Sequence, residues 1–101
     1  MHARVTTVEI RPGTLVDELL PFYESAAHQQ QGMKGFVSTQ LLTDRTANKG
    51  MIVTLFETLA DLEASATVPQ QTMADPRVAA ALAGPPVIAM YEVAVQVTAH
   101  Q

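Results

Sequence analysis

The sequence predicts a single α+β domain over residues 1–101, with the ferredoxin-like element order β-α-β-β-α-β. Two observations support this. Runs rich in β-branched residues occur near both ends and in the middle of the chain, and turn residues separate them. Apolar residues at helical spacing fill the stretches between these runs. The order predicts a four-stranded antiparallel sheet whose helices all cover one face.

The first strand and helix follow from local signals. Residues 3–10, ARVTTVEI, favour a strand that stops at the turn sequence RPG. A helix is expected over residues 14–31, because a Thr-x-x-Asp pattern resembles a capping box and a glycine follows the last position. Pro21 lies inside this helix, so we expect a kink or a break near Leu20.

The second half of the chain repeats these signals. A Thr-x-x-Asp pattern starts one helix, and the pair Asp75-Pro76 starts another, with an N-cap acid before a proline. The polar loop DRTANKG connects two strands as a hairpin. The expected elements are strands over residues 33–43, 50–58 and 87–98 and helices over residues 58–66 and 75–82.

One strand is apolar on both faces. In MIVTLFE, residues 51–57, Met51, Val53 and Leu55 alternate with Ile52 and Phe56, which are also apolar. Helices can cover only one of these faces. Isolated modules rarely expose an apolar patch larger than a few hundred Å². Charged residues make up 16% of the chain, against a usual share of about 25%, which also indicates covered surface. We therefore predict a homodimer formed by sheet-to-sheet packing.

Composition disfavours several classes of protein. The net charge is −4 and the six Lys and Arg are scattered, so nucleic acid is not an expected partner. No apolar run approaches the ~18 residues of a membrane-spanning helix. The chain has no cysteine, which removes thiolate catalysis and cysteine–zinc sites. Without an export feature, the predicted location is the cytoplasm.

The segments ARVTTVEIRPG and QQQGMKGFVSTQLLTDRTANKGMIVTLFETLADLEA resemble the antibiotic-biosynthesis-monooxygenase branch of the dimeric α/β-barrel superfamily. The resemblance implies a cofactor-independent monooxygenase for a small aromatic or polyketide-like substrate, with no cofactor. Haem-degrading relatives use an Asn near the position of Thr6, a Trp on the second helix and a His beyond it. This chain has no Trp, and no His between His28 and His100, so haem degradation is not expected.

Five residues are candidates for the site. Tyr23 and His28 are the candidate catalytic residues, because a phenol and an imidazole can move protons or bind an anion. Each also has a structural alternative, Tyr23 as a core residue and His28 as an exposed helix-end residue. Thr6 and Phe56 occupy the family's pocket positions. Tyr91, the third ligand-binding candidate, could equally pack in the core or in the dimer interface.

Three functions remain open from the sequence. The first is the cofactor-free monooxygenase. The second is a non-catalytic homodimeric module that binds a small apolar ligand, and the third is a structural or interaction dimer. A cavity of ~300 Å³ or more between helices and sheet would favour the first two.

Overall fold

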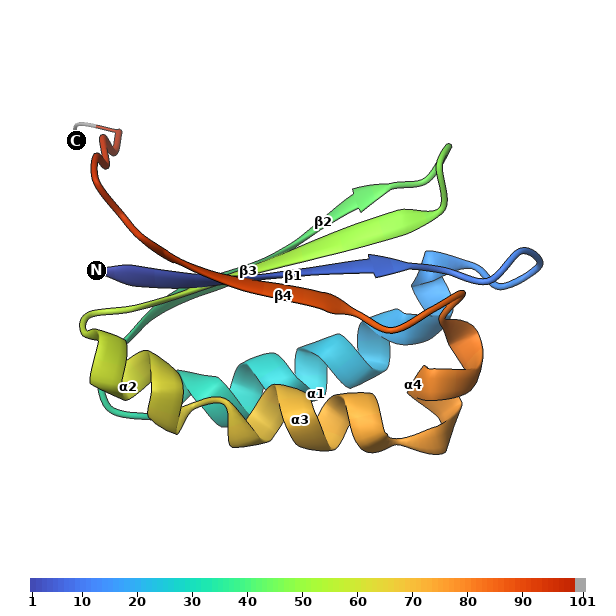
Figure 1. Cartoon of the computed structure of the whole chain (residues 1–101), viewed down its shortest axis with the longest axis horizontal. Coiled ribbons are helices and arrows are strands. Elements are labelled where there is room, and N and C mark those ends of the chain that lie inside the picture. The colour runs from blue at the N-terminus through green and yellow to red at the C-terminus, as the bar shows by residue number, and fades with distance from the viewer. Residues whose placement is uncertain (100–101) are drawn as a thin grey trace.

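The protein, described by a computed structural model over residues 1–99, has a layer of helices against one face of a sheet (Figure 1). Its strands are β1 (His2–Glu9), β2 (Phe36–Asp44), β3 (Lys49–Phe56) and β4 (Val87–Glu92). Its helical segments are the 3₁₀ turn η1 (Val16–Leu19) and helices α1 (Leu20–Gln31), α2 (Leu59–Ala64), α3 (Thr67–Ala74) and α4 (Pro76–Ala81). The four strands lie in the order β2-β3-β1-β4 and pair antiparallel throughout, which confirms the predicted ferredoxin-like architecture.

The first helix is broken where Pro21 predicts a break. Residues before Leu20 form η1, and α1 begins at Leu20 with the proline in its first turn, where no backbone donor is needed. The Thr-x-x-Asp cap expected at Thr14 is wrong. Instead the Leu15 backbone N–H donates to the Glu18 carboxylate at 2.7 Å, because the short 3₁₀ turn starts one residue later.

The later helices confirm both predicted caps and add one helix. The Thr58 hydroxyl accepts from the Asp61 N–H at 3.1 Å, and the Asp75 carboxylate accepts from the Arg77 N–H at 2.8 Å. Helix α3, between them, was not expected, because Pro69 lies in its first turn and its sequence TVPQQTMA has little apolar periodicity. The proline is tolerated there since the first-turn donors of a helix have no internal partners.

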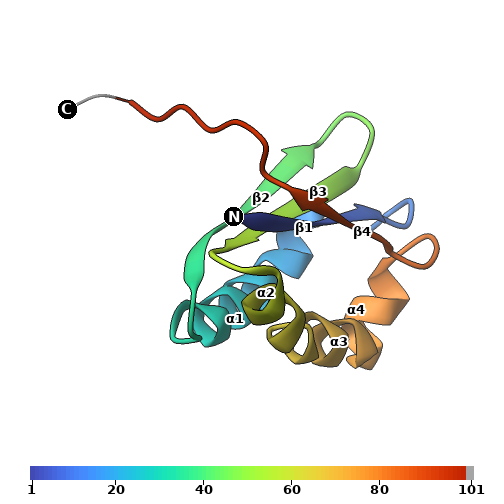
Figure 2. The ribbon, with the colours of Figure 1, turned by 60° about the vertical axis from the view of Figure 1, so that its left-hand side comes forward.

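The last strand is shorter than predicted. β4 ends at Glu92, the Val93 N–H still donates to the Met1 carbonyl at 3.0 Å, and residues 94–99 leave the sheet (Figure 2). The reason lies in the register: Glu92 pairs with His2, the first residue of β1, so the neighbouring strand ends there. Alternation of valines alone could not show this, because a strand needs a partner to persist.

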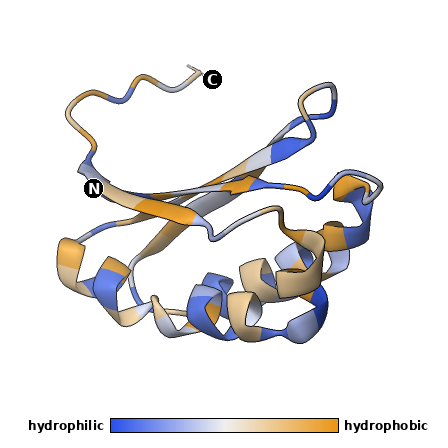
Figure 3. Cartoon of the chain, turned by 45° about the vertical axis from the view of Figure 1, so that its right-hand side comes forward, coloured by the Kyte–Doolittle hydropathy of each residue, from blue (hydrophilic) through white to orange (hydrophobic). Residues whose placement is uncertain are grey.

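The register decides which side chains face the helices. Arg4 pairs with Thr54 and Thr6 with Ile52 on the helix-facing side. Val5 pairs with Val53 on the opposite side, which no other element of residues 1–99 covers in Figure 1. Figure 3 shows that hydrophobic residues are frequent in the strands as well as in the helices. We call the side of the sheet that carries Val5 and Val53, opposite the helices, the open face.

The core lies between the helix-facing side and the helices. One cluster joins Val8 of β1 to Val78 and Leu82 at the end of α4. At the other end, Leu62 of α2 and Phe56 of β3 are completely buried. No helix within residues 1–99 combines the length and the apolar character needed to cross a membrane.

Candidate functional site

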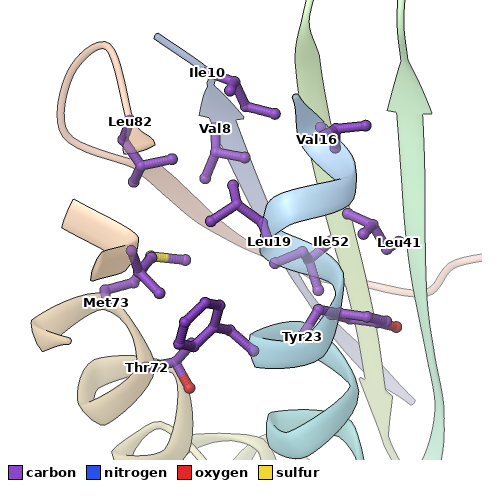
Figure 4. Close-up of a pocket in the computed structure, with 13 residues that line it drawn as sticks. Val8, Ile10, Val16, Leu19, Tyr23, Leu41, Ile52, Thr72, Met73 and Leu82 are labelled. Carbon is purple, nitrogen blue, oxygen red and sulfur yellow. The ribbon is translucent and has the colours of Figure 1, made fainter. Parts of the chain in front are cut away.

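A small apolar cavity lies between the helix-facing side of the sheet and helices α1, α3 and α4 (Figure 4). Its volume is about 50 Å³, and almost all of its wall is apolar. We call it the helix–sheet cavity. The residues that define it come from three strands, from η1 and from three α-helices, and they include Val8, Leu19, Tyr23, Leu41, Ile52, Met73 and Val78. On its own it is smaller than the ~300 Å³ expected of a ligand pocket.

A larger, open groove adjoins this cavity between α3 and β4. It has a volume of about 450 Å³ and is lined by Arg4, Ala66, Pro69, Gln70, Met73, Ala74, Pro86, Ile88 and Met90. We call it the α3–β4 groove. Met73 lines both the groove and the helix–sheet cavity, so one flexible thioether side chain lies at their common boundary.

A third small space lies at the same boundary, and several of the side chains in its largely apolar wall are polar. It measures about 30 Å³ and is lined by Thr6, Tyr23, Thr54 and Met73 together with Arg4 and other residues. The Tyr23 hydroxyl donates to the Thr39 hydroxyl at 3.3 Å, and the Thr39 and Thr54 hydroxyl oxygens are 2.9 Å apart. These hydroxyls form a hydrogen-bonded row from α1 across β2 and β3. Figure 4 shows the Tyr23 side chain extended toward β2, in agreement with this contact.

A buried arginine forms the charged part of the site. Arg4 is only 4% exposed, and its guanidinium donates to the Gln30 side-chain oxygen at 2.8 Å, the Ser65 hydroxyl at 3.0 Å and the Leu62 carbonyl at 3.3 Å. These contacts connect β1 to α1 and α2. Burial lowers the pKa of Arg4, because desolvation disfavours its charged form. The group nevertheless stays a cation at neutral pH, as arginine does in proteins.

The structure brings together some of the residues predicted from the sequence. Thr6 and Tyr23 line the same space of about 30 Å³. Phe56 is fully buried and packs edge-to-face against Phe36 with ring centres 5.6 Å apart, outside these three spaces. His28 is exposed on α1 and also lines none of them. Tyr91 is 57% exposed on the open face, on the other side of the sheet.

Sequence reasoning missed the buried polar residues Arg4, Gln30, Thr54 and Ser65. A partial signal existed, because Arg4 has the same parity as Val8 in β1 and Gln30 lies four residues after Ala26 in α1. That signal becomes useful only once the helix-facing parity is known.

The cavity walls offer no histidine to a haem iron. Within residues 1–99 the histidines are His2 and His28, and neither lines the three spaces described above. His100 lies outside the described residues. No group of three or more possible metal-ligating acids or histidines occurs in the same part of the chain. The site does not fit a haem held by a histidine.

No protein-family model and no curated protein matches the sequence, whereas solved structures match its fold. An antibiotic biosynthesis monooxygenase aligns with 91% of this chain and 97% of its own, at 14% identity and a TM-score of 0.72. SnoaB, a cofactor-independent oxygenase from Streptomyces nogalater, aligns over 94% of both chains at 12% identity and a TM-score of 0.74. MhuD, a heme-degrader from Mycobacterium tuberculosis, aligns with 97% of this chain and 100% of its own, at 23% identity and a TM-score of 0.72. These likenesses confirm the resemblance at the level of fold: the chain has the fold of antibiotic-biosynthesis-monooxygenase-like domains.

Proposed function

We propose that the protein is a cofactor-independent monooxygenase acting on a small aromatic or polyketide-like substrate. The observation that carries the proposal is the α3–β4 groove of about 450 Å³, which adjoins the apolar helix–sheet cavity at Met73 and so lies close to the hydroxyl row at Tyr23. A flat aromatic ring suits such walls, and the few polar groups at one end can orient it. SnoaB, which shares the fold, is a cofactor-independent oxygenase.

The reaction needs little from the protein beyond placement. A substrate with an acidic methylene group, such as an anthrone, loses a proton to give a carbanion that reduces dioxygen. The resulting hydroperoxide loses water and leaves a carbonyl group. One oxygen atom enters the product, the other leaves as water, and the substrate supplies all four electrons. The protein's share is to hold the ring, exclude bulk water and stabilise the substrate oxyanion.

Tyr23 is the residue that the proposal places at the reacting substrate. Its ring lines the helix–sheet cavity, and its hydroxyl donates to Thr39 in the absence of substrate. On binding, the hydroxyl would exchange Thr39 for the substrate oxygen, while the Thr39–Thr54 pair stays in place. His28, the second catalytic candidate, lies exposed on α1 and would have to exchange protons from outside the cavity.

Oxygen uptake tests this assignment. With an anthrone as substrate, the wild type should consume about one O₂ per anthrone, and Tyr23→Phe should lower kcat by about 100-fold, as the loss of one oxyanion donor does. Ser25→Ala removes a hydroxyl from an exposed position of the same helix and should leave the rate unchanged. His28→Ala decides whether the second candidate contributes. Unchanged activity in Tyr23→Phe would remove that residue from the mechanism.

A non-catalytic binding module is the second candidate function. The observation that favours it is that Tyr23 is the one titratable side chain lining the helix–sheet cavity within residues 1–99, and its hydroxyl already has a partner. Such a protein would bind the same flat ligands without oxygen consumption. Binding of an anthrone without uptake above the buffer rate would establish this candidate over the enzyme.

In either case the proposal includes a homodimer formed through the open face. That face presents Met51, Val87 and Tyr91, exposed by 38%, 67% and 57%, with Val53 between them. A second copy of the same sheet would cover them symmetrically. If neither binding nor oxygen uptake were found, this dimer alone would remain, as a structural or interaction protein.

A further inference from the structure

Within residues 1–99, Arg4 is a buried cation without an acidic partner. Its hydrogen-bond acceptors are the side chains of Gln30 and Ser65 and the Leu62 carbonyl, all of which are neutral. Among residues 1–99, the ion pairs join Arg45 to Asp17 and Arg77 to Asp75. A buried charge is costly unless it is paired, because water no longer solvates it. The neutral acceptors, two of which lie at the end of α2, offset only part of this cost.

This cation borders the α3–β4 groove. Arg4 is the only charged residue among those that line the groove in the described part of the chain. The rest of the wall is apolar, including Met73, Ile88 and Met90, apart from the amide of Gln70. The groove therefore combines a large apolar surface with a single positive charge at its inner side.

We propose that the α3–β4 groove binds a small amphiphilic anion, a flat apolar body with one carboxylate or phenolate, whose charge lies against Arg4. This rests on the proposed function and narrows its substrate class. A single negative charge matches a single guanidinium, which can hold a carboxylate with two parallel hydrogen bonds. A phosphate dianion would remain undercompensated, because among the described residues no Lys and no second Arg lines the groove.

The geometry also orients the ligand. An acid group beside Arg4 puts the attached ring next to Met73, and beyond Met73 lies the helix–sheet cavity with Tyr23. The anionic end would then stay near β1 and α2, while the reacting carbon points toward the hydroxyl row. Arg4 acts in this arrangement as a specificity-determining residue that selects and positions the ligand.

A matched pair of ligands tests the charge preference. The probes are 9-anthracenecarboxylate and its primary amide, which have nearly the same shape and differ in charge at neutral pH. Titrations followed by anthracene fluorescence give both dissociation constants. The wild type should bind the carboxylate at least about tenfold more tightly than the amide, the order of effect expected of a charge-assisted hydrogen bond.

Variants connect the preference to Arg4. Arg4→Gln should abolish the preference while the amide still binds, and Arg4→Lys should keep part of it, since lysine retains the charge but not the planar fork. Arg45→Gln removes an exposed arginine of the hairpin, far from the groove in sequence, and should keep the full preference. Circular dichroism melts establish that each variant is folded. If Arg4→Gln does not fold, the carboxylate preference of Arg4→Lys, compared with that of the wild type, still shows whether Arg4 sets this preference.

The outcomes separate this inference from the proposed function. Equal binding of both probes by the wild type, or a preference that survives in Arg4→Gln, would overturn the inference. If a neutral anthrone were still oxidised, the monooxygenase proposal would stand without it. A preference that depends on Arg4 in a protein that consumes no oxygen would support the inference in a binding module. Binding of neither probe would overturn it outright.

Discussion

The substitution Val53→Asp, which places a charge on the open face, tests the proposed dimer most sharply. This residue lies in β3, an inner strand, where it pairs with Val5 of β1 and Gln40 of β2. It is half-buried in the single chain, and neither cross-strand partner carries a charge. In a sheet-to-sheet dimer, Val53→Asp would bury a carboxylate in each protomer with no cation opposite it in the register.

The magnitude follows from the cost of an uncompensated buried charge, taken as about 3 kcal/mol. Two-fold symmetry doubles it to about 6 kcal/mol per dimer, which raises the dimer dissociation constant by about 10⁴-fold. Sedimentation velocity over a concentration series measures this constant. Thermal unfolding should lose its concentration dependence as the variant becomes monomeric, since a folded partner stabilises by mass action.

The test of Val53→Asp needs a control substitution away from the open face. Ala79→Asp adds the same charge to an exposed position of α4 in the helix layer, and it should leave the dimer intact. If Val53→Asp sedimented as the same dimer as the wild type, the interface would have to lie elsewhere. If the wild type were monomeric at every concentration, the dimer proposal would fail entirely.

Three other outcomes are expected. Leu62→Ala removes a completely buried side chain of α2 and should cost about 2–5 kcal/mol, lowering Tm by at least about 10 °C in a calorimetric scan. Arg45 holds the pKa of the Asp17 carboxyl below its usual value. The stability that this ion pair contributes is therefore complete above the pKa of Asp in the unfolded chain, about 3.9. It is lost as the pH falls through the lower pKa of the folded protein. Melts should accordingly show Arg45→Gln less stable than the wild type at neutral pH, with the two converging in acid. Ala74→Trp should block the α3–β4 groove and weaken anthracene binding in a fluorescence titration.

Each of these outcomes has a matched comparison. Leu59→Ala truncates an exposed leucine of α2 and should change Tm little, so equal losses at both positions would contradict the burial argument. High salt should shrink the effect of Arg45→Gln, because exposed charges are screened, and a difference that persisted at low pH would refute its assignment to Asp17. Ala79→Trp places the same bulk outside the groove, and it should bind like the wild type.

Local signals predicted much of the fold because they act within a few residues. The caps at Thr58 and Asp75 and the break at Pro21 each depend on one side chain and one backbone group. The cap expected at Thr14 is a local error, whereas two other errors came from interactions over longer distances. Helix α3 has weak periodicity of its own and packs against α1, while β4 ends at Glu92 because its partner strand ends.

The site was harder to predict than the fold, and strand parity is the reason. The register places Arg4 and Thr6 on the buried, helix-facing side. Without the register, an arginine in a strand is equally consistent with a solvent-exposed position and with a buried one. Tyr23 was accessible to sequence reasoning, because helical spacing alone puts it on the apolar stripe of α1. His28 shows the converse: its chemistry attracted attention, yet it is exposed.

The function proposed for this small domain is the insertion of oxygen into an aromatic substrate without a cofactor. The most direct test is single-turnover oxidation of an anthrone under isotopically labelled dioxygen, with chelator-treated protein and no added reductant, followed by mass spectrometry of the quinone. The proposal predicts one labelled oxygen atom in the product, formed faster than in buffer and more slowly with Tyr23→Phe. Product that forms only at the buffer rate, or whose new oxygen comes from water, would contradict it.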